Sequence, residues 1–158
     1  SRNRRKGQPL LRLRAGRKTD VRSQFAALCW RIRKDKVEVC LVTSRRSGRW
    51  ILPKGWPMNK TTPAKAAATE AWEEAGVKGR AVDHCLGVYS DLKTLRKGTM
   101  PVVVMVYPVA VTETFAVWPE HKQRRRKWVS RKKAARKIKN PALARIVAEF
   151  DPARLDGM

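Results

Sequence analysis

Acidic side chains are scarce in this sequence. Only 13 of its 158 residues are Asp or Glu, whereas 37 are Lys or Arg, and the formal net charge is +24. Solubility requires much less charge than this, so solubility alone is the weaker explanation. The excess instead favours a polyanionic partner or environment: a nucleic acid, an acidic membrane surface or a highly phosphorylated small molecule.

Cysteine and histidine are also few, and their spacing matches none of the common zinc motifs. Cys29, Cys40 and Cys85 form no CxxC or zinc-knuckle pattern, and His84 and His121 show no metal-ligand spacing. All three cysteines lie in apolar stretches, which predicts buried free thiols in a reducing compartment. We therefore expect a cytoplasmic protein.

Long apolar runs are missing as well. The longest run, residues 102–111, is interrupted by Pro108 and is too short to cross a bilayer as a helix. The sequence starts without the charged and then apolar pattern of a signal peptide. We expect a flexible basic arm at residues 1–18, followed by a single domain with its own core at residues 19–158.

Short, apolar, β-rich stretches predict a series of strands. They fall at residues 25–30, 37–43, 50–52, 81–89, 102–111 and 126–129. The first two flank a charged turn and therefore predict a hairpin. Between the strands, residues 54–57 have the pattern of a turn and residues 90–99 that of a polar loop.

Three segments carry helix signals. Thr62 and Pro63 predict the cap and the first residue of a helix that continues to residue 75, and Gly76 predicts its C-terminal stop. Residues 130–138 predict a short basic helix, and residues 140–150 predict an amphipathic one. Strands flanked by helices in this way predict an α/β sandwich.

The first predicted helix concentrates negative charge. Glu70, Glu73 and Glu74 are three of the few acidic residues, and positions three and four apart share one face of a helix. Their mutual repulsion would be relieved by Mg²⁺ or Mn²⁺, hard cations that prefer carboxylate oxygens and often bridge to substrate phosphates. On spacing alone, a solvated acidic face paired with Lys and Arg is the commoner explanation.

Residues 55–77 resemble the Nudix box. That pattern is Gly, five residues, Glu, seven residues, Arg-Glu, an aliphatic residue, any residue, Glu-Glu, any residue, Gly and an aliphatic residue. The residues in register are Gly55, Glu70, Ala71, Glu73, Glu74, Gly76 and Val77. Thr61 replaces the first Glu of the pattern, and Thr69 replaces the Arg that helps to orient the carboxylates in the family.

The resemblance implies a Nudix-type α/β/α sandwich with a mixed β-sheet, and an enzyme that uses Mg²⁺ or Mn²⁺ to hydrolyse a diphosphate linkage. It implies that Glu70, Glu73 and Glu74 are metal ligands, with the Lys54 carbonyl as an additional one. Glu70 and Glu73 are the expected catalytic residues, and Glu70 is the candidate that orients or deprotonates the attacking water.

Within the family, the sequence looks most like the diphosphoinositol polyphosphate phosphohydrolases. Residues 44–51, residues 73–79 and the basic cluster at residues 124–128 carry this resemblance. Those enzymes bind inositol pyrophosphates through many basic side chains and also cleave diadenosine polyphosphates. Guanidinium groups bind phosphate oxygens in pairs. The expected substrate-binding residues are Arg45, Arg46, Arg49, Arg96, Lys97 and Arg126.

A second hypothesis comes from a different class of protein. The replacements at Thr61 and Thr69, together with the net charge of +24, also fit a catalytically weak relative that binds nucleic acid or another polyanion. The sequence has no RNA-binding aromatic motif, and this hypothesis leaves the three glutamates unexplained. Nucleic acid is therefore the secondary partner after a polyphosphorylated small molecule, and the sequence does not give the oligomeric state.

Overall fold

The computed structural model describes residues 22–155 of the chain. The basic arm predicted at residues 1–18 lies outside the described residues, as do both ends of the domain predicted at residues 19–158, so these boundaries stay predictions. Within residues 22–155, no helix is long and apolar enough to span a membrane.

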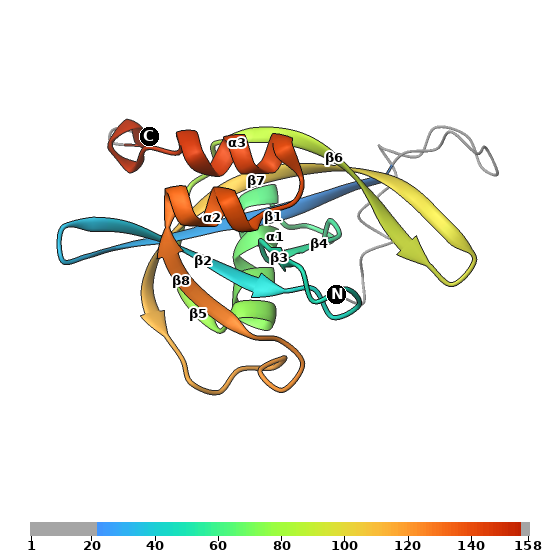
Figure 1. Ribbon diagram of the computed structural model, residues 1–158, viewed down its shortest axis with the longest axis horizontal. Helices are drawn as coiled ribbons and strands as arrows, with labels where there is room; N and C mark the ends of the chain where they lie inside the picture. The colour runs from blue at the N-terminus through green and yellow to red at the C-terminus, as the bar shows by residue number, and fades with distance from the viewer. Residues whose placement is uncertain (1–21, 156–158) are drawn as a thin grey trace.

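An eight-stranded mixed sheet forms the centre of the fold (Figure 1). Its strands are β1 (Arg22–Arg33), β2 (Lys36–Thr43), β3 (Trp50–Ile51), β4 (Lys54–Gly55), β5 (Val77–Ala81), β6 (Gly87–Leu95), β7 (Gly98–Thr114) and β8 (Arg126–Ser130). The predicted hairpin of β1 and β2 is confirmed. β7 runs parallel to β1, with Arg22 opposite Val102 and Trp30 opposite Ala110. The central strands β1 and β7 are largely apolar, as expected for strands that helices cover on both faces of the sheet.

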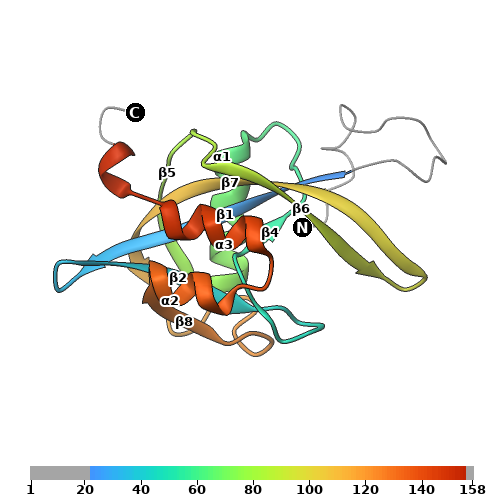
Figure 2. The ribbon, with the colours of Figure 1, turned by 45° about the horizontal axis from the view of Figure 1, so that its top comes forward.

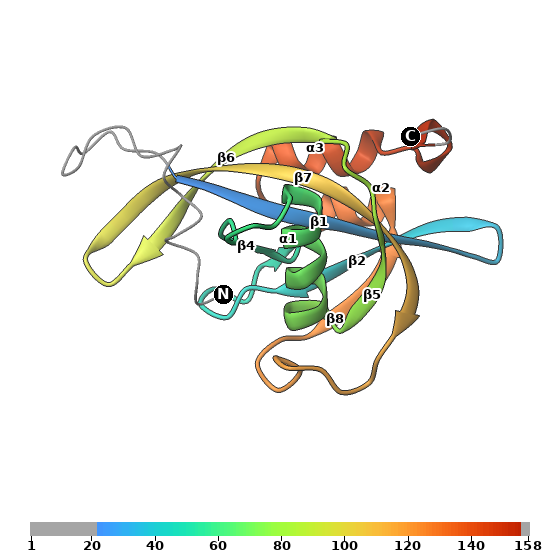
Figure 3. The same ribbon diagram turned by 180° about the vertical axis from the view of Figure 1, so that it is seen from behind.

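Helices pack on both faces of this sheet. On one face lie α2 (Arg131–Lys137) and α3 (Pro141–Glu149), side by side and followed by a 3₁₀ turn, η4 (Pro152–Leu155) (Figure 2). On the other face lies α1 (Pro63–Glu70), which continues as a π-helical turn, η3 (Ala71–Ala75) (Figure 3).

The helices α1, α2 and α3 begin where the sequence predicts. The side chains of Thr62, Ser130 and Asn140 accept hydrogen bonds from backbone N–H groups of the first turn, as N-caps do. Two separate apolar clusters fill the two layers. Leu28, Leu41 and Val104 belong to the cluster under α2 and α3, whereas alanines of α1 pack with Ala27 and Val42 in the other. The α/β sandwich predicted from the sequence is confirmed.

Some local predictions are wrong. Residues 90–99 form no loop but a hairpin between β6 and β7, with Arg96 and Lys97 at its turn. The hairpin is largely exposed, so its strands need no apolar residues and resemble a loop in sequence. The predicted strand at residues 81–89 is broken between β5 and β6, which leaves Cys85 exposed, whereas Cys29 and Cys40 are buried free thiols.

A further correction concerns residues 54–57, which were expected to form a turn. Lys54 and Gly55 instead form β4 and pair with Ala26 and Phe25 of β1. A Lys-Gly dipeptide carries no β signal of its own. Its position is fixed by the neighbouring strand, and the pairing places it directly beside the C-terminal half of the α1–η3 segment.

Candidate functional site

The three glutamates lie where α1 widens into the π-helical turn η3. The alanine-rich segment favours a helix, and Gly76 ends it in the left-handed conformation, with φ of 66°. Glu70 and Glu74 are buried, at 2% and 7% exposure, and Glu73 is half-buried. Single π turns of this kind occur frequently at functional sites.

Glu70 packs against a glycine of β4. Gly55 has no side chain, and a Cβ atom at this position would collide with the Glu70 carboxyl group, including Oε2. Glu70 Oε2 is buried and has no hydrogen-bond partner. A buried polar atom without a partner is uncommon and needs an explanation, such as a role in binding an ion. The close approach also explains why the sequence needs Gly at position 55.

Gly55→Ala should therefore displace the Glu70 carboxyl group. We expect a loss of about 1–3 kcal/mol in the free energy of unfolding, as for other overpacked sites, together with loss of the hydrolytic activity that the sequence resemblance implies. Gly87→Ala is the matched control, because its Cβ would meet the flexible Ile146 side chain on the other face of the sheet. Urea unfolding and turnover check both variants. Unchanged activity in Gly55→Ala would contradict the placement of Glu70.

Glu74 is held from two sides. Its Oε1 accepts a hydrogen bond from the Lys54 backbone N–H at 3.2 Å, and its Oε2 lies 3.4 Å from a terminal nitrogen of Arg124. The Lys54 side chain points elsewhere, donating to Gln24 Oε1 at 2.9 Å. The structure thus brings the Lys54 backbone to Glu74, but the contact is made by the N–H, and the role predicted for the Lys54 carbonyl as a metal ligand stays a prediction.

Arg124 also brings a fourth carboxylate to the site. Arg124 Nε donates to Glu120 Oε1 at 2.7 Å, and Nη1 donates to the Thr43 carbonyl at 2.9 Å. The Glu120 backbone N–H donates to the Glu73 carbonyl at 3.1 Å. The Arg124 side chain is only 6% exposed. Neither residue was predicted to contact the glutamates, although their acid–base spacing of four was a signal.

Burial and repulsion change how these acids ionise. Burial, with added repulsion from Glu74, raises the pKa of Glu70 to about 8. Burial also raises the pKa of Glu74 to about 7, although the positive charge of Arg124 opposes this shift. The pair therefore holds protons near neutral pH that ordinary glutamates release.

The stability of the metal-free protein should consequently fall as pH rises. The unfolded chain releases these protons near the ordinary glutamate value of 4.5, whereas the folded chain keeps them until about pH 7–8. Between these limits the folded state binds more protons, so each pH unit costs up to about 1.4 kcal/mol per retained proton. Urea unfolding between pH 5 and about pH 8.5 measures the slope. Glu70→Gln should flatten it, and an equal slope in that variant would refute the assignment.

The donor atoms suit a hard divalent cation in kind, but they do not form a closed cage. Among residues 22–155, no group of three or more His, Cys, Asp or Glu side chains is arranged to hold a metal ion. Mg²⁺ usually keeps several waters and takes one or two carboxylates together with substrate phosphates. The partnerless Glu70 oxygen and the repulsion between Glu70 and Glu74 fit such a partial site.

The expected phosphate-binding residues separate into two groups. Arg45, Arg46 and Arg49 are exposed on the loop between β2 and β3, and Arg45 donates to Gln123 Oε1 at 3.1 Å. Gln123 immediately precedes Arg124, so this loop lies beside the segment that reaches Glu74. Arg96 and Lys97 instead lie at the tip of the β6–β7 hairpin, which projects away from α1 (Figure 3).

Arg126 lies close to the glutamate segment, but its guanidinium is already engaged. Its Nη1 donates to the carbonyls of Ala75 and Phe115, at 2.9 and 2.7 Å, and its Cζ lies 4.2 Å from the ring centroid of Trp118. These contacts tie the end of η3 to the segment after β7. In this arrangement Arg126 supports the framework of the site.

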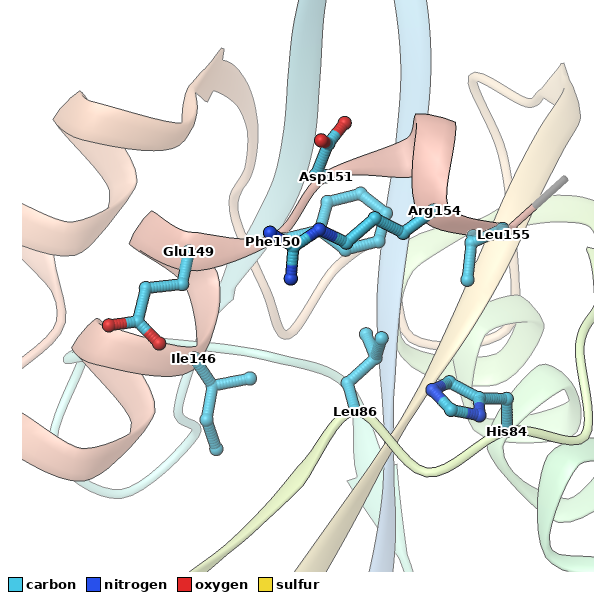
Figure 4. Close-up of a pocket in the computed structure, with 8 residues that line it drawn as sticks. All are labelled: His84, Leu86, Ile146, Glu149, Phe150, Asp151, Arg154 and Leu155. Carbon is cyan, nitrogen blue, oxygen red and sulfur yellow. The ribbon is translucent and has the colours of Figure 1, made fainter.

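A separate pocket lies on the opposite face of the sheet (Figure 4). It has a volume of about 230 Å³ and is formed by α3, η4 and the segment before β6. Leu86, Ile146 and Phe150 supply apolar walls, and charged side chains surround them. None of the expected site residues lines it, and the Glu70 carboxylate belongs to the other layer, so this pocket is not the candidate site.

Comparison with known proteins gives a family match over most of the chain. The family model described as "NUDIX domain" matches residues 22–150. "Nudix hydrolase 16, mitochondrial" of Arabidopsis thaliana is 35% identical over 109 residues, which cover 66% of this chain and 60% of that protein. Human "Diphosphoinositol polyphosphate phosphohydrolase 3-beta" is 32% identical over 109 residues, covering 68% and 63%. The chain thus spans less than two thirds of the length of these relatives.

Solved structures share the fold at low sequence identity. A C. elegans Ap4A hydrolase in a binary complex superposes with a TM-score of 0.62 at 18% identity, covering 87% of this chain and 99% of that one. A NUDIX hydrolase from Nitrosomonas europaea gives 0.61 at 17% identity, covering 80% and 86%. The mixed sheet between two helical layers is the architecture that these proteins have in common.

Proposed function

The chain belongs to the Nudix family, and we propose that it is a metal-dependent hydrolase that cleaves a diphosphate linkage in a polyphosphorylated substrate. The observation that carries this proposal is the buried Glu70 carboxyl group, which packs against Gly55, leaves Oε2 without a partner and lies beside Glu74. The proposed cofactor is Mg²⁺ or Mn²⁺. Glu70, Glu73 and Glu74 and the Lys54 carbonyl are its proposed protein ligands, and because the carboxylates alone do not enclose an ion, substrate phosphates and water would complete the site.

The proposed mechanism assigns a role to each carboxylate. When bound, a divalent cation neutralises phosphate oxygens and makes water a better nucleophile at neutral pH. Glu70 is the proposed acceptor of the proton from the attacking water. Burial and repulsion from Glu74 raise its pKa to about 8 in the metal-free protein, so once ionised it is a stronger base than an ordinary glutamate, and a bound cation would favour the ionised form. Glu73 and Glu74 supply negative charge to the cation site, and the Lys54 N–H and Arg124 fix the direction of the Glu74 carboxyl group.

Arg124 offers a replacement for the arginine missing at position 69. The Thr69 hydroxyl donates to the Lys65 carbonyl of its own helix at 3.1 Å and carries no charge. Arg124 approaches from the segment before β8 and contacts both Glu74 and Glu120. We propose that Arg124 orients the carboxylates in this chain, so that the departure at Thr69 is compatible with catalysis.

The basic loop between β2 and β3 supports a substrate with many phosphates. Arg45, Arg46 and Arg49 are exposed, and the loop contacts the Gln123–Arg125 segment through the Arg45 side chain. The names of the human relative and of the C. elegans structure point to diphosphoinositol polyphosphates and Ap4A. An inositol pyrophosphate or a dinucleoside polyphosphate is therefore the proposed substrate class, with Arg96, Lys97 and Arg126 as less direct candidates for binding it.

Arg45→Ala and Arg49→Ala should each raise KM about tenfold or more for a heavily phosphorylated substrate. A charged hydrogen bond contributes roughly 1.5–3 kcal/mol, and 1.4 kcal/mol corresponds to a factor of ten. The increase in KM for a nucleoside diphosphate should be smaller, because a substrate with fewer phosphates makes fewer contacts with these arginines. Arg33→Ala, on the exposed β1–β2 hairpin, removes the same charge elsewhere. If Arg33→Ala raised KM equally, general attraction would explain the effect and the loop assignment would fail.

A substrate screen tests the proposed function directly. Inositol pyrophosphates, diadenosine polyphosphates, and nucleoside di- and triphosphates should be incubated with the full chain and either Mg²⁺ or Mn²⁺. We expect turnover of at least one diphosphate that stops when the metal is chelated. Absence of metal-dependent turnover across the screen would overturn the proposal.

A location in the cytoplasm stays a prediction, since the buried free thiols Cys29 and Cys40 fit any reducing compartment.

A further inference from the structure

Trp50 lies within a group of cations that the proposed hydrolase mechanism does not use. The charged ends of Arg125, Lys127 and Lys137 lie 5.4, 5.6 and 5.9 Å from the centroid of its ring. We call Trp50, Arg125, Lys127, Lys133 and Lys137 the Trp50 patch. Its residues come from β3, β8, α2 and the segment before β8, so the fold assembles the patch from separate parts of the chain.

The patch faces away from the glutamates. Trp50 packs against the apolar cluster under α2 and α3, whereas α1 packs with the cluster of the opposite layer. Two consecutive arginines mark the division. Arg124 contacts Glu74 and Glu120, while the guanidinium of Arg125 lies over the Trp50 ring. Alternate residues of an extended segment point to opposite sides, which explains how adjacent arginines serve two different surfaces.

Positive charge in the patch is not balanced by nearby acids. Residues 126–137 contain seven Lys or Arg and no Asp or Glu. In the part of the chain that the structure describes, no ion pair joins a patch residue to a carboxylate. Lys127 and then Lys133 contribute to lowering the pKa of Lys137, as neighbouring like charges do. A bound anion would relieve this repulsion.

We infer that the Trp50 patch binds single-stranded nucleic acid, with its cations on the phosphates and Trp50 against a base. Every base has an aromatic face, so proteins that bind single strands combine a basic surface with aromatic rings. Inorganic polyphosphate has no aromatic face on which Trp50 could stack, and a membrane would engage the ring only through burial of its apolar surface, which Leu also provides. The row of cations also continues along α2 through Lys133 and Arg136, which suits a chain of phosphates better than one small anion.

The patch is tested with the full chain and a fluorescein-labelled single strand of about 12 nucleotides, within the usual site size. Lys127→Gln with Lys137→Gln should weaken binding about tenfold or more. The slope of log K against log salt should become shallower by about 1.4, since each phosphate contact on a single strand contributes about 0.7. Lys34→Gln with Lys36→Gln, on the exposed β1–β2 hairpin, removes the same charge and is the matched control.

The aromatic contribution is tested separately. Trp50→Leu should weaken strand binding about tenfold, whereas Trp50→Phe should retain most of it, because Phe keeps a stacking ring. Binding of inorganic polyphosphate, or of vesicles with anionic lipid, should be the same in both Trp50 variants. Melting temperature and hydrolytic turnover, which the patch should not affect, confirm that each variant is folded.

Three results would overturn the inference. Equal losses in the two double lysine variants would show that only net charge matters. Equal strand affinity for Trp50→Leu and Trp50→Phe would exclude base stacking. Loss of vesicle binding in the Lys127 and Lys137 variant, with strand binding unchanged, would assign the surface to a membrane instead.

Discussion

Glu73→Gln combined with Glu74→Gln is expected to reduce kcat by about two to four orders of magnitude, the range typical for loss of a positioned proton-transfer group or metal site. It should also abolish stabilisation by Mg²⁺ or Mn²⁺. In the unsubstituted protein, metal at about a hundred times its Kd should add about 2.7 kcal/mol to the free energy of unfolding. The reason is that Glu74 and Glu73 both repel the buried Glu70 carboxyl group, whose Oε2 has no partner, so a cation at this site would relieve the repulsion.

The stability of the Glu73 and Glu74 double variant without metal shows whether the substitutions remove only metal ligands or also damage the fold. Glu74→Gln removes a carboxylate whose charged form burial disfavours, but it also removes one partner of Arg124. Because Arg124 keeps its contacts with Glu120 and the Thr43 carbonyl, this variant should lose less stability than Arg124→Met. Glu113→Gln with Glu149→Gln removes two exposed charges and serves as the control. Calorimetry with and without metal, together with turnover, measures both effects. A full metal-dependent shift in the Glu73 and Glu74 variant would remove the central proposal.

Local features of the site could be predicted from the sequence. The cap at Thr62, the stop at Gly76 and the proximity of Glu70 and Glu74 depend on residues within a few positions of one another. The need for Gly55 followed only from the resemblance, because its cause is a contact with Glu70, fifteen positions along the chain. The widening of the helix after Glu70 carries no sequence signal that we recognise.

Other parts of the site depend on tertiary structure. Arg124 is fifty positions from Glu74, and it reaches the carboxylate because β8 pairs with β2. Arg126 fits the phosphate-binding pattern in sequence, yet its guanidinium is taken up by backbone carbonyls. The sequence gives the number of basic residues in this chain. It does not show which of them face the glutamates and which face Trp50. Only the strand pairing makes that distinction.

Arg124→Met should lower kcat by about a hundredfold at pH 7. The guanidinium is nearly buried, and it lowers the pKa of Glu74. Without it the Glu74 pKa should rise, so a larger fraction of Glu74 would be protonated at pH 7 and unable to support a cation. Activity should therefore recover in part as the pH is raised towards 9. Removing one partner of a buried ion pair also costs about 3–5 kcal/mol of stability, which Arg124→Lys should partly restore.

Moving the positive charge from position 124 to position 69 tests whether Arg124 acts by orienting the carboxylates or only by stabilising the fold. If Arg124 replaces the arginine expected at position 69, Thr69→Arg should restore part of the kcat of Arg124→Met and change the unsubstituted protein little. Arg125→Met is the matched control, because it removes the same charge from the adjacent position, on the Trp50 side of the sheet. It should leave kcat and its pH profile unchanged. Equal losses in Arg124→Met and Arg125→Met, with no recovery from Thr69→Arg, would show that Arg124 does not orient the carboxylates.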